Sequence, residues 1–428
     1  MKVTKGDFAV RVLGRKIRSG SANTRWPGAA VAAAEQNCEG RKENAGASHK
    51  AIIPNSAMTV RDSVSEQPTV SVIVPARNEE ACLGSCLQSL IAQTGVHFEI
   101  IVVDDESTDR TREIAESFPG VRVINPRDLL RGWSGKNNAL MAGAKKARGE
   151  WFLFTDADTV HRPGALAASM AEAHQQKADL LSYSPEQEVH GLWEKAVMPV
   201  IFAELASSYR TVDVNNPASS AAAANGQYIL ISRAAYESVG GHAAVGASLL
   251  EDVALARAVK ASDRRIFFRY GGDVVRTRMY RSFAQLKEGW TKNLVLLFQA
   301  PVRLAILRLT EFVLIIACLA IAVATSLRSK WHPAVIALVL LAVLYGFLFK
   351  RIRRAHFSWD ANLLSLFGLP LFSYLLARSK MAYQNGTVSW KGRQYGRSLS
   401  SASIKGSNRR KRRNYKRPPQ VAPREPAN

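Results

Sequence analysis

Cysteine is scarce in this 428-residue chain, and the four that occur, Cys38, Cys82, Cys86 and Cys318, are scattered. Cys82 and Cys86 stand one helical turn apart, but two thiols are too few for a zinc site. Core packing is therefore their expected role, and a reducing compartment is compatible with the chain. The first 65 residues also lack an apolar run, which argues against a secretory signal.

Acidic residues are scarce too, with 35 Asp and Glu against 58 Lys and Arg, and the deficit lies mainly at the two ends. Residues 378–428 hold 14 basic residues and one acid, and residues 1–57 hold ten and four. Such tails are typical of solvated segments, of nucleic-acid binding or of attraction to anionic lipids, at roughly 1 kcal/mol per basic residue. Because apolar runs adjoin the C-terminal tail, we expect an anionic membrane surface as the partner and no nucleic acid.

The chain divides into four parts by composition. Residues 1–65 show no sustained periodicity and are predicted to be a disordered basic segment. Residues 66–298 carry the patterns of a folded domain, and residues 299–380 are rich in long apolar runs. Residues 381–428 form the basic C-terminal tail.

The folded part predicts an α/β domain with a largely parallel sheet, because apolar and β-branched runs alternate with helical patterns. The runs at 69–75, 98–105, 121–124 and 151–156 read as strands. Ligands of open α/β sheets bind at the carboxyl ends of the strands. Two of these strands end in acids, so we expect both to deliver carboxylates to one edge.

The two acidic strand ends are Asp104-Asp105 and Asp156-Ala157-Asp158. Side chains at i and i+2 point the same way along a strand, so Asp156 and Asp158 can face one ligand. Their hard oxygens suit Mg²⁺ or Mn²⁺, with water and phosphate completing the shell. A helix-capping role near Ser107 is the alternative for the first pair.

Three further motifs carry candidate chemistry. Glu251-Asp252 starts a helical pattern, where acids either favour the helix dipole or include a general base beside an acceptor hydroxyl. Gly135-Lys136 precedes another helix and suits a diphosphate or a base carbonyl, although the spacing is not that of a Walker A loop. His242 follows a glycine turn and could bind phosphate or metal, but a lone histidine is more often a structural hydrogen-bonder.

Three apolar runs, 312–327, 333–349 and 361–377, predict membrane association because basic residues bracket each of them. We expect the first two to span the bilayer. The third contains Gly368 and Pro370 and is predicted to be re-entrant or spanning.

Six segments, taken in order, resemble the family 2 glycosyltransferases with a GT-A fold. They are Val70–Glu79, Val102–Ser107, Gly135–Leu140, Thr155–Asp158, Gly226 with Gly240-Gly241, and Glu251-Asp252. Within that family the chain is similar to membrane-bound enzymes acting on lipids, of the hopanoid-associated and carotenoid types. Trp390-Lys391-Gly392-Arg393-Gln394-Tyr395 resembles the C-terminal ending of those enzymes.

The resemblance implies a nucleotide-sugar donor, with a role for each matching residue. The nucleotide pocket would be lined by Pro75, Arg77, Glu79, Asp104, Asp105, Lys136 and Asp156. Of these, Asp105 would hydrogen-bond the uracil and Asp156 would hold the ribose. Asp158 would bind the metal. Asp252 would be the base that deprotonates the acceptor, supported by Glu251.

One departure from the family bears on the product. Processive synthases carry Gln-x-x-Arg-Trp, whereas here Gln285 is followed by Trp290 one place late, with no arginine between them. This favours transfer of a single sugar to a membrane lipid, with Trp290, Trp390 and Arg393 as candidates near the acceptor. A processive synthase, a non-catalytic scaffold and a nucleotidyltransferase remain alternatives. Because nucleotide sugars are cytosolic, we expect a multi-pass protein of the inner cell membrane with a cytoplasmic catalytic domain.

Overall fold

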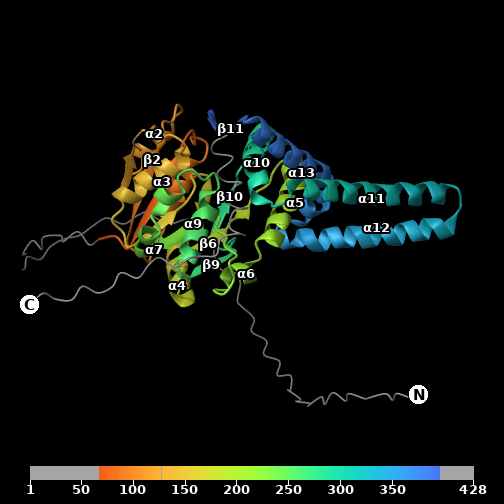
Figure 1. Cartoon of the computed structure of the whole chain (residues 1–428), viewed down its shortest axis with the longest axis horizontal. Helices are drawn as coiled ribbons and strands as arrows, with labels where there is room; N and C mark the ends of the chain where they lie inside the picture. Colours follow the sequence, from red (N-terminus) through yellow and green to blue (C-terminus); the bar gives the residue numbers. More distant parts are fainter. Residues whose placement is uncertain (1–66, 127, 396–428) are drawn as a thin grey trace, which may run out of the picture. The chain divides into compact units, whose positions relative to one another are not determined.

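The computed structural model describes residues 67–126 and 128–395 of the chain (Figure 1). The predicted N-terminal segment 1–65 and the part of the basic tail beyond residue 395 lie outside these residues.

A seven-stranded sheet forms the centre of the folded domain, in the order β3-β2-β1-β4-β8-β6-β9. Its strands are β1 (Val70–Ala76), β2 (Phe98–Asp104), β3 (Val121–Ile124), β4 (Trp151–Phe154), β6 (Leu180–Ser184), β8 (Ile229–Ser232) and β9 (Ile266–Tyr270). Only β8 runs antiparallel to its neighbours. The predicted α/β domain with a largely parallel sheet is therefore confirmed.

Helices cover both faces of this sheet, because strand side chains alternate between the two faces. Val70, Val72 and Val74 of β1 lie in one core cluster and Ile73 in the other. The first face packs against α1 (Leu83–Ile91), α2 (Thr111–Glu116) and α4 (Ala165–Gln176), and the second against α3 (Gly135–Lys146), α7 (Arg233–Ser238) and α9 (Glu251–Ala261). Both faces of β1 are buried, which explains why all its residues except Ser71 are apolar.

Smaller elements complete the domain. A three-stranded sheet consists of β5 (Thr159–His161), β10 (Val275–Thr277) and β7 (Glu186–Gln187), and two short helices are α6 (Thr211–Asn215) and α8 (Gly241–Val245). The antiparallel pair β11 (Val388–Trp390) and β12 (Arg393–Tyr395) forms a hairpin that we call the C-terminal hairpin. The start of the predicted tail, 381–395, is thus ordered as a helix end and this hairpin.

A second, helical part consists of α5 (Leu192–Ser208), α10 (Phe283–Leu297), α11 (Pro301–Leu327), α12 (Trp331–Ile352), the 3₁₀ turn η1 (Arg353–Ala355) and α13 (Trp359–Asn385). Three helices here are long and apolar enough to cross a membrane. In their most apolar stretches, 11% of residues are buried in α11, 17% in the stretch that starts with α12, and 50% in α13. The first two, which pair side by side in Figure 1, therefore expose apolar surface along most of their length, whereas α13 packs extensively against protein.

Gly368 and Pro370 do not interrupt the third apolar segment, contrary to expectation, because α13 continues through both. Gly368 instead permits close contact between α13 and α5. A Cβ atom added there would lie 1.9 Å from the carbonyl oxygen of Ala196. The glycine therefore reports close helix packing and not a helix break.

Replacing Gly368 with alanine is expected to destabilise the protein by about 1–3 kcal/mol, because the added methyl group must push the α5 backbone away. Gly346→Ala in α12 is the matched control, since a Cβ there meets nothing within 4 Å. Thermal unfolding of the detergent-solubilised protein measures both. Equal melting temperatures for the two variants would contradict the packing argument.

Candidate active site

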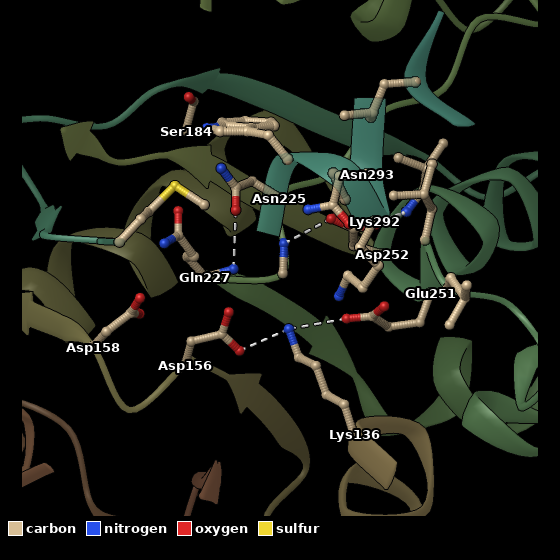
Figure 2. Close-up of a pocket in the computed structure, with 18 of the residues that line it drawn as sticks. Lys136, Asp156, Asp158, Ser184, Asn225, Gln227, Glu251, Asp252, Lys292 and Asn293 are labelled. Carbon is tan, nitrogen blue, oxygen red and sulfur yellow. Dashed lines mark hydrogen bonds and ion pairs between the residues drawn. The ribbon is translucent and has the colours of Figure 1, made fainter. Parts of the chain in front are cut away.

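A cavity of about 860 Å³ lies at the carboxyl edge of β1, β2 and β4. Its walls also include the first turns of α3 and α9, one side of α10 and the C-terminal hairpin. Figure 2 shows Asp156, Asp158, Glu251 and Asp252 in the same pocket as Lys136. Asp105 also lines this cavity, so acids from three distant segments lie together, as the strand ends of β2 and β4 led us to expect for Asp105 and Asp156.

The two aspartates after β2 are separated by the fold. Asp105 lines the cavity, together with the predicted residues Pro75, Arg77 and Glu79. Asp104 is not among the cavity residues, and its carboxylate accepts the backbone N–H of Ser107 at 3.2 Å. Asp104 therefore holds the turn after β2, although α2 begins only at Thr111 and has no side-chain cap. Direct contact with a nucleotide remains a prediction for Asp105.

Lys136 links two of the acidic clusters. Its ammonium lies 2.7 Å from Asp156 and 2.9 Å from Glu251, as the dashed lines in Figure 2 show. Burial alone would lower the pKa of Lys136, but the two carboxylates raise it well above its ordinary value. The lysine therefore stays charged and holds the β4 end beside the start of α9.

Asn137 positions the same helix start and was not identified from the sequence. It is fully buried, and its side-chain amide donates to the carbonyls of Val245, Gly246 and Ser248 at 2.8–3.1 Å. These contacts fix the loop that leads into Glu251. The Gly-Lys-Asn-Asn sequence indicated a loop before a helix, but nothing local indicated that Asn137 reaches a segment more than 100 residues away.

Asp252 is held rigidly in the first turn of α9. Its carboxylate accepts the backbone N–H of Gly226 at 3.0 Å and that of Val253 at 2.7 Å. Burial and the adjacent Glu251 raise the pKa of Asp252 to about 6. For Glu251, burial opposes ionisation, yet Lys136 and Lys292 hold its pKa below the ordinary value. The pKa values of these two neighbouring carboxyls are thus shifted in opposite directions, which is the pattern expected of a base and its supporting acidic residue.

The C-terminal hairpin closes one side of the cavity. Arg393 pairs with both carboxylate oxygens of Asp105, and Lys391 pairs with Glu79. The Trp390 ring lies 5.0 Å from the ammonium of Lys292, which comes from α10. Trp390 and Arg393 were predicted near the active site, and both line the cavity.

Comparison with known proteins identifies the family. The family model described as Glycosyl transferase family 2 matches residues 71–240. The chain is 30% identical to the 4,4'-diaponeurosporenoate glycosyltransferase of Staphylococcus aureus (strain MRSA252), over 76% of this chain and 88% of the relative. The chain belongs to glycosyltransferase family 2. It is thus an enzyme of the GT-A class that transfers sugar from a nucleotide sugar, and the predicted family and fold are confirmed.

Two solved structures of related glycosyltransferases were also found. The mannosyltransferase PcManGT from Pyrobaculum calidifontis, in complex with GDP-Man and Mn²⁺, is 18% identical with a TM-score of 0.42, covering 74% of this chain and 87% of that one. S. aureus TarS in complex with UDP-GlcNAc is 17% identical with a TM-score of 0.37, covering 74% and 92%.

Two residues of this glycosyltransferase proposed from sequence have mainly packing contacts. His242 lies outside the cavity, where its ring contacts Phe154 and its Nδ1 lies 3.0 Å from the Tyr236 hydroxyl. Burial lowers the pKa of His242 to about 4, so the ring is neutral and the structural alternative describes it. Trp290 is 2% exposed and packs in the core around α5 and α10, although it also borders the cavity.

The carboxylates of this glycosyltransferase site supply only some of the ligands that a divalent cation needs. Asp158 Oδ1 is buried and has no hydrogen-bond partner among the described residues. Burial and the nearby Asp156 and Glu79 carboxylates raise the pKa of Asp158, so a cation would relieve the cost of its charge. Within residues 67–126 and 128–395, no three His, Cys, Asp or Glu side chains converge. Such a site suits Mg²⁺ or Mn²⁺ that takes its remaining ligands from phosphate and water.

Proposed function

We propose that this family 2 enzyme transfers a single sugar, with inversion, from a nucleotide-diphosphate sugar such as a UDP-sugar to a membrane lipid. The observation that carries the proposal is the continuity of one cavity. Its lining includes the strand ends at Pro75 and Asp105, the carboxylate of Asp252 and an apolar wall on α5. Donor and acceptor sites thus share one space with the candidate base between them.

The acceptor side of the cavity supports a lipid. Leu205 and Tyr209 from the end of α5 and Leu297 from α10 line it, together with Arg354 and His356 at the end of α12. This wall lies on α5, which packs against α12, one of the two helices that expose apolar surface and are expected in the bilayer. The relative 4,4'-diaponeurosporenoate glycosyltransferase is named for a carotenoid, which supports an apolar acceptor for this enzyme too.

The mechanism assigns the proton and the leaving group to different residues. An acceptor oxygen attacks the anomeric carbon, its proton passes to Asp252, and the bond from that carbon to the diphosphate oxygen breaks with the electron pair leaving on the diphosphate. The carboxylate of Asp252 is already oriented by Gly226 and Val253, so little reorganisation is needed. Asp158, with Asp156 beside it, would hold a Mg²⁺ or Mn²⁺ that neutralises charge on the leaving group.

Membrane placement follows from the same geometry. We propose that α11 and α12 cross the inner membrane as a hairpin, with their predicted spans 312–327 and 333–349. We propose that the catalytic domain lies in the cytoplasm, because nucleotide sugars are available there. The extensively packed α13 then lies at or within the interface, with its exposed residues Leu363, Phe367 and Met381 facing lipid.

Mass spectrometry of lipids from membranes containing the enzyme, after incubation with labelled UDP-sugars and Mn²⁺, is expected to show one added hexose on a lipid. Asp158→Asn should remove this product, because the variant loses the unpartnered carboxylate oxygen. Membranes without the enzyme provide the background. A ladder of increasing sugar number would instead indicate a processive synthase, and no product from any nucleotide sugar would favour a scaffold.

A further inference from the structure

The C-terminal hairpin is anchored at the active site by its own packing. Val388 and Tyr395 are buried and form a small core with Leu249 and Tyr383. Leu249 belongs to the loop that leads into α9, so the hairpin rests against the segment that carries the candidate base. Since β11 follows α13 after a turn at Gly386, the hairpin is also a direct continuation of an apolar helix.

The hairpin turn presents Lys391 in an unfavourable backbone conformation. Lys391 and Gly392 form a two-residue turn in which both φ angles are positive, at 45° and 77°. Turns of this kind favour Asn, Asp or Gly at the first position, and lysine gains nothing there from its backbone. Residues held in this region often serve a site, so the role of Lys391 lies in its side chain.

Both hairpin cations reach carboxylates at the donor edge of the sheet. Lys391 pairs with Glu79 and donates to the carbonyl of Arg77 at 3.1 Å. Arg393 pairs with Asp105, with a second contact to Glu106 at 2.9 Å. These partners follow the carboxyl ends of β1 and β2. The nucleotide of the proposed function would lie at this edge.

Arg393 also lies against a helix N-terminus, which favours anions over cations. A Cβ added to Gly135, the first residue of α3, would lie 1.8 Å from Arg393 Nη1. A cation and the positive end of a helix are therefore brought to the same point, and Asp105 offsets them in this structure. A phosphate group is a ligand that both groups would bind together.

Lys136, at the same edge, is already paired with carboxylates. Lys136 is shared between Asp156 and Glu251, and the arginine of the processive Gln-x-x-Arg-Trp motif is absent from Gln285–Trp290. An incoming diphosphate therefore draws on other cations that line the cavity, and Lys391 and Arg393 are two of them, beside Arg77 and Lys292.

We propose that Lys391 and Arg393 are diphosphate-binding residues: when the donor enters, they move from Glu79 and Asp105 to the phosphate oxygens. This exchange frees Asp105 to hydrogen-bond the nucleobase. As the bond from the sugar to the diphosphate breaks, the two cations stabilise the charge on the departing oxygen. The inference rests on the nucleotide-diphosphate donor of the proposed function.

Calorimetric titration of the full-length protein in detergent tests the exchange with two ligand pairs, UDP with uridine and GDP with guanosine. Lys391→Met and Arg393→Gln are each expected to weaken the bound diphosphate by about tenfold or more, as loss of a charge-assisted hydrogen bond does. Affinity for the corresponding nucleoside should hold or rise, because it makes no phosphate contact. Arg378→Gln, on the exposed surface of α13, carries the same charge change and should alter neither.

The outcomes separate this inference from the proposed function. If Lys391→Met and Arg393→Gln both fold and bind the diphosphate as tightly as the wild type or more tightly, the hairpin only occupies the site, and the assignment is overturned. An equal loss of nucleoside and diphosphate binding would indicate a structural role and would overturn it too. A wild-type enzyme that binds neither UDP nor GDP would contradict the donor itself, and the hairpin assignment with it.

Discussion

Asp252→Asn is expected to lower the rate of sugar transfer by about 10²–10⁴-fold, the usual contribution of a general base. Nucleotide binding should persist, because the donor edge at Pro75, Asp105 and Lys136 is unchanged. Asparagine can accept only one of the two backbone N–H groups that Asp252 accepts. We therefore also expect a modest stability loss of about 1–3 kcal/mol, as for one unsatisfied donor.

The measurement is single-turnover transfer alongside titration with UDP and a thermal melt. Asp263→Asn is the matched control: it makes the same substitution just beyond the other end of α9, at an exposed position with φ of 60° that asparagine tolerates well. Its rate should equal that of the wild type. Transfer at the normal rate by Asp252→Asn would remove Asp252 from the mechanism.

The raised pKa of Asp252 also sets the expected pH dependence. A base works in its deprotonated form, so kcat/KM should fall as the pH drops through about 6, the value to which burial and Glu251 raise this carboxyl. Above pH 7 this carboxyl is ionised and contributes no further change to the profile. An acid limb near pH 4, typical of an ordinary aspartate, or the same limb in the asparagine variant, would assign the titration to another group.

The sequence predicted the parts of this site that depend on local pattern. Strand periodicity placed Asp105 and Asp156 at the edge of one sheet, because parallel strands end together. The sequence did not separate Asp104 from Asp105: Asp104 is the last residue of β2 and does not line the cavity, whereas Asp105 lies just beyond the strand and does.

Contacts between distant segments could not be predicted in this way. Arg393 contacts Asp105, which is 288 residues away in the sequence. The periodicity around neither residue indicates the other as its partner. The role of Gly368 could not be predicted for a related reason, since glycine serves both helix ends and close helix contacts. Only the position of α5 decides between them.

A buried cluster of four charges is expected to be the most sensitive point in the protein's stability. Glu204 of α5 contacts Arg308 of α11 at 2.9 Å and Arg351 of α12 at 3.3 Å, and Glu311 contacts the same two arginines at 2.7 and 2.8 Å. The four side chains are only 7–17% exposed. Two acids and two bases thus balance where the catalytic domain meets the apolar hairpin of α11 and α12.

Glu204→Gln should destabilise the protein by about 3–5 kcal/mol, because it leaves an uncompensated positive charge in a buried site. The melting temperature in detergent measures the loss. Glu237→Gln is the control: it removes an exposed ion pair 3.5 Å long, which is worth about 1 kcal/mol at most.

Replacing all four charges of the cluster with apolar residues separates net charge from shape. Buried ion clusters are often no more stabilising than well-packed apolar side chains, so the fourfold variant should melt closer to the wild type than Glu204→Gln does. Its activity is the more informative readout, because α5 also supplies Phe202 and Leu205 to the cavity wall. If stability recovers while transfer to lipid stays low, the cluster's function is to hold α5 in register with the membrane helices. Full recovery of both would show that any tight packing at this junction suffices.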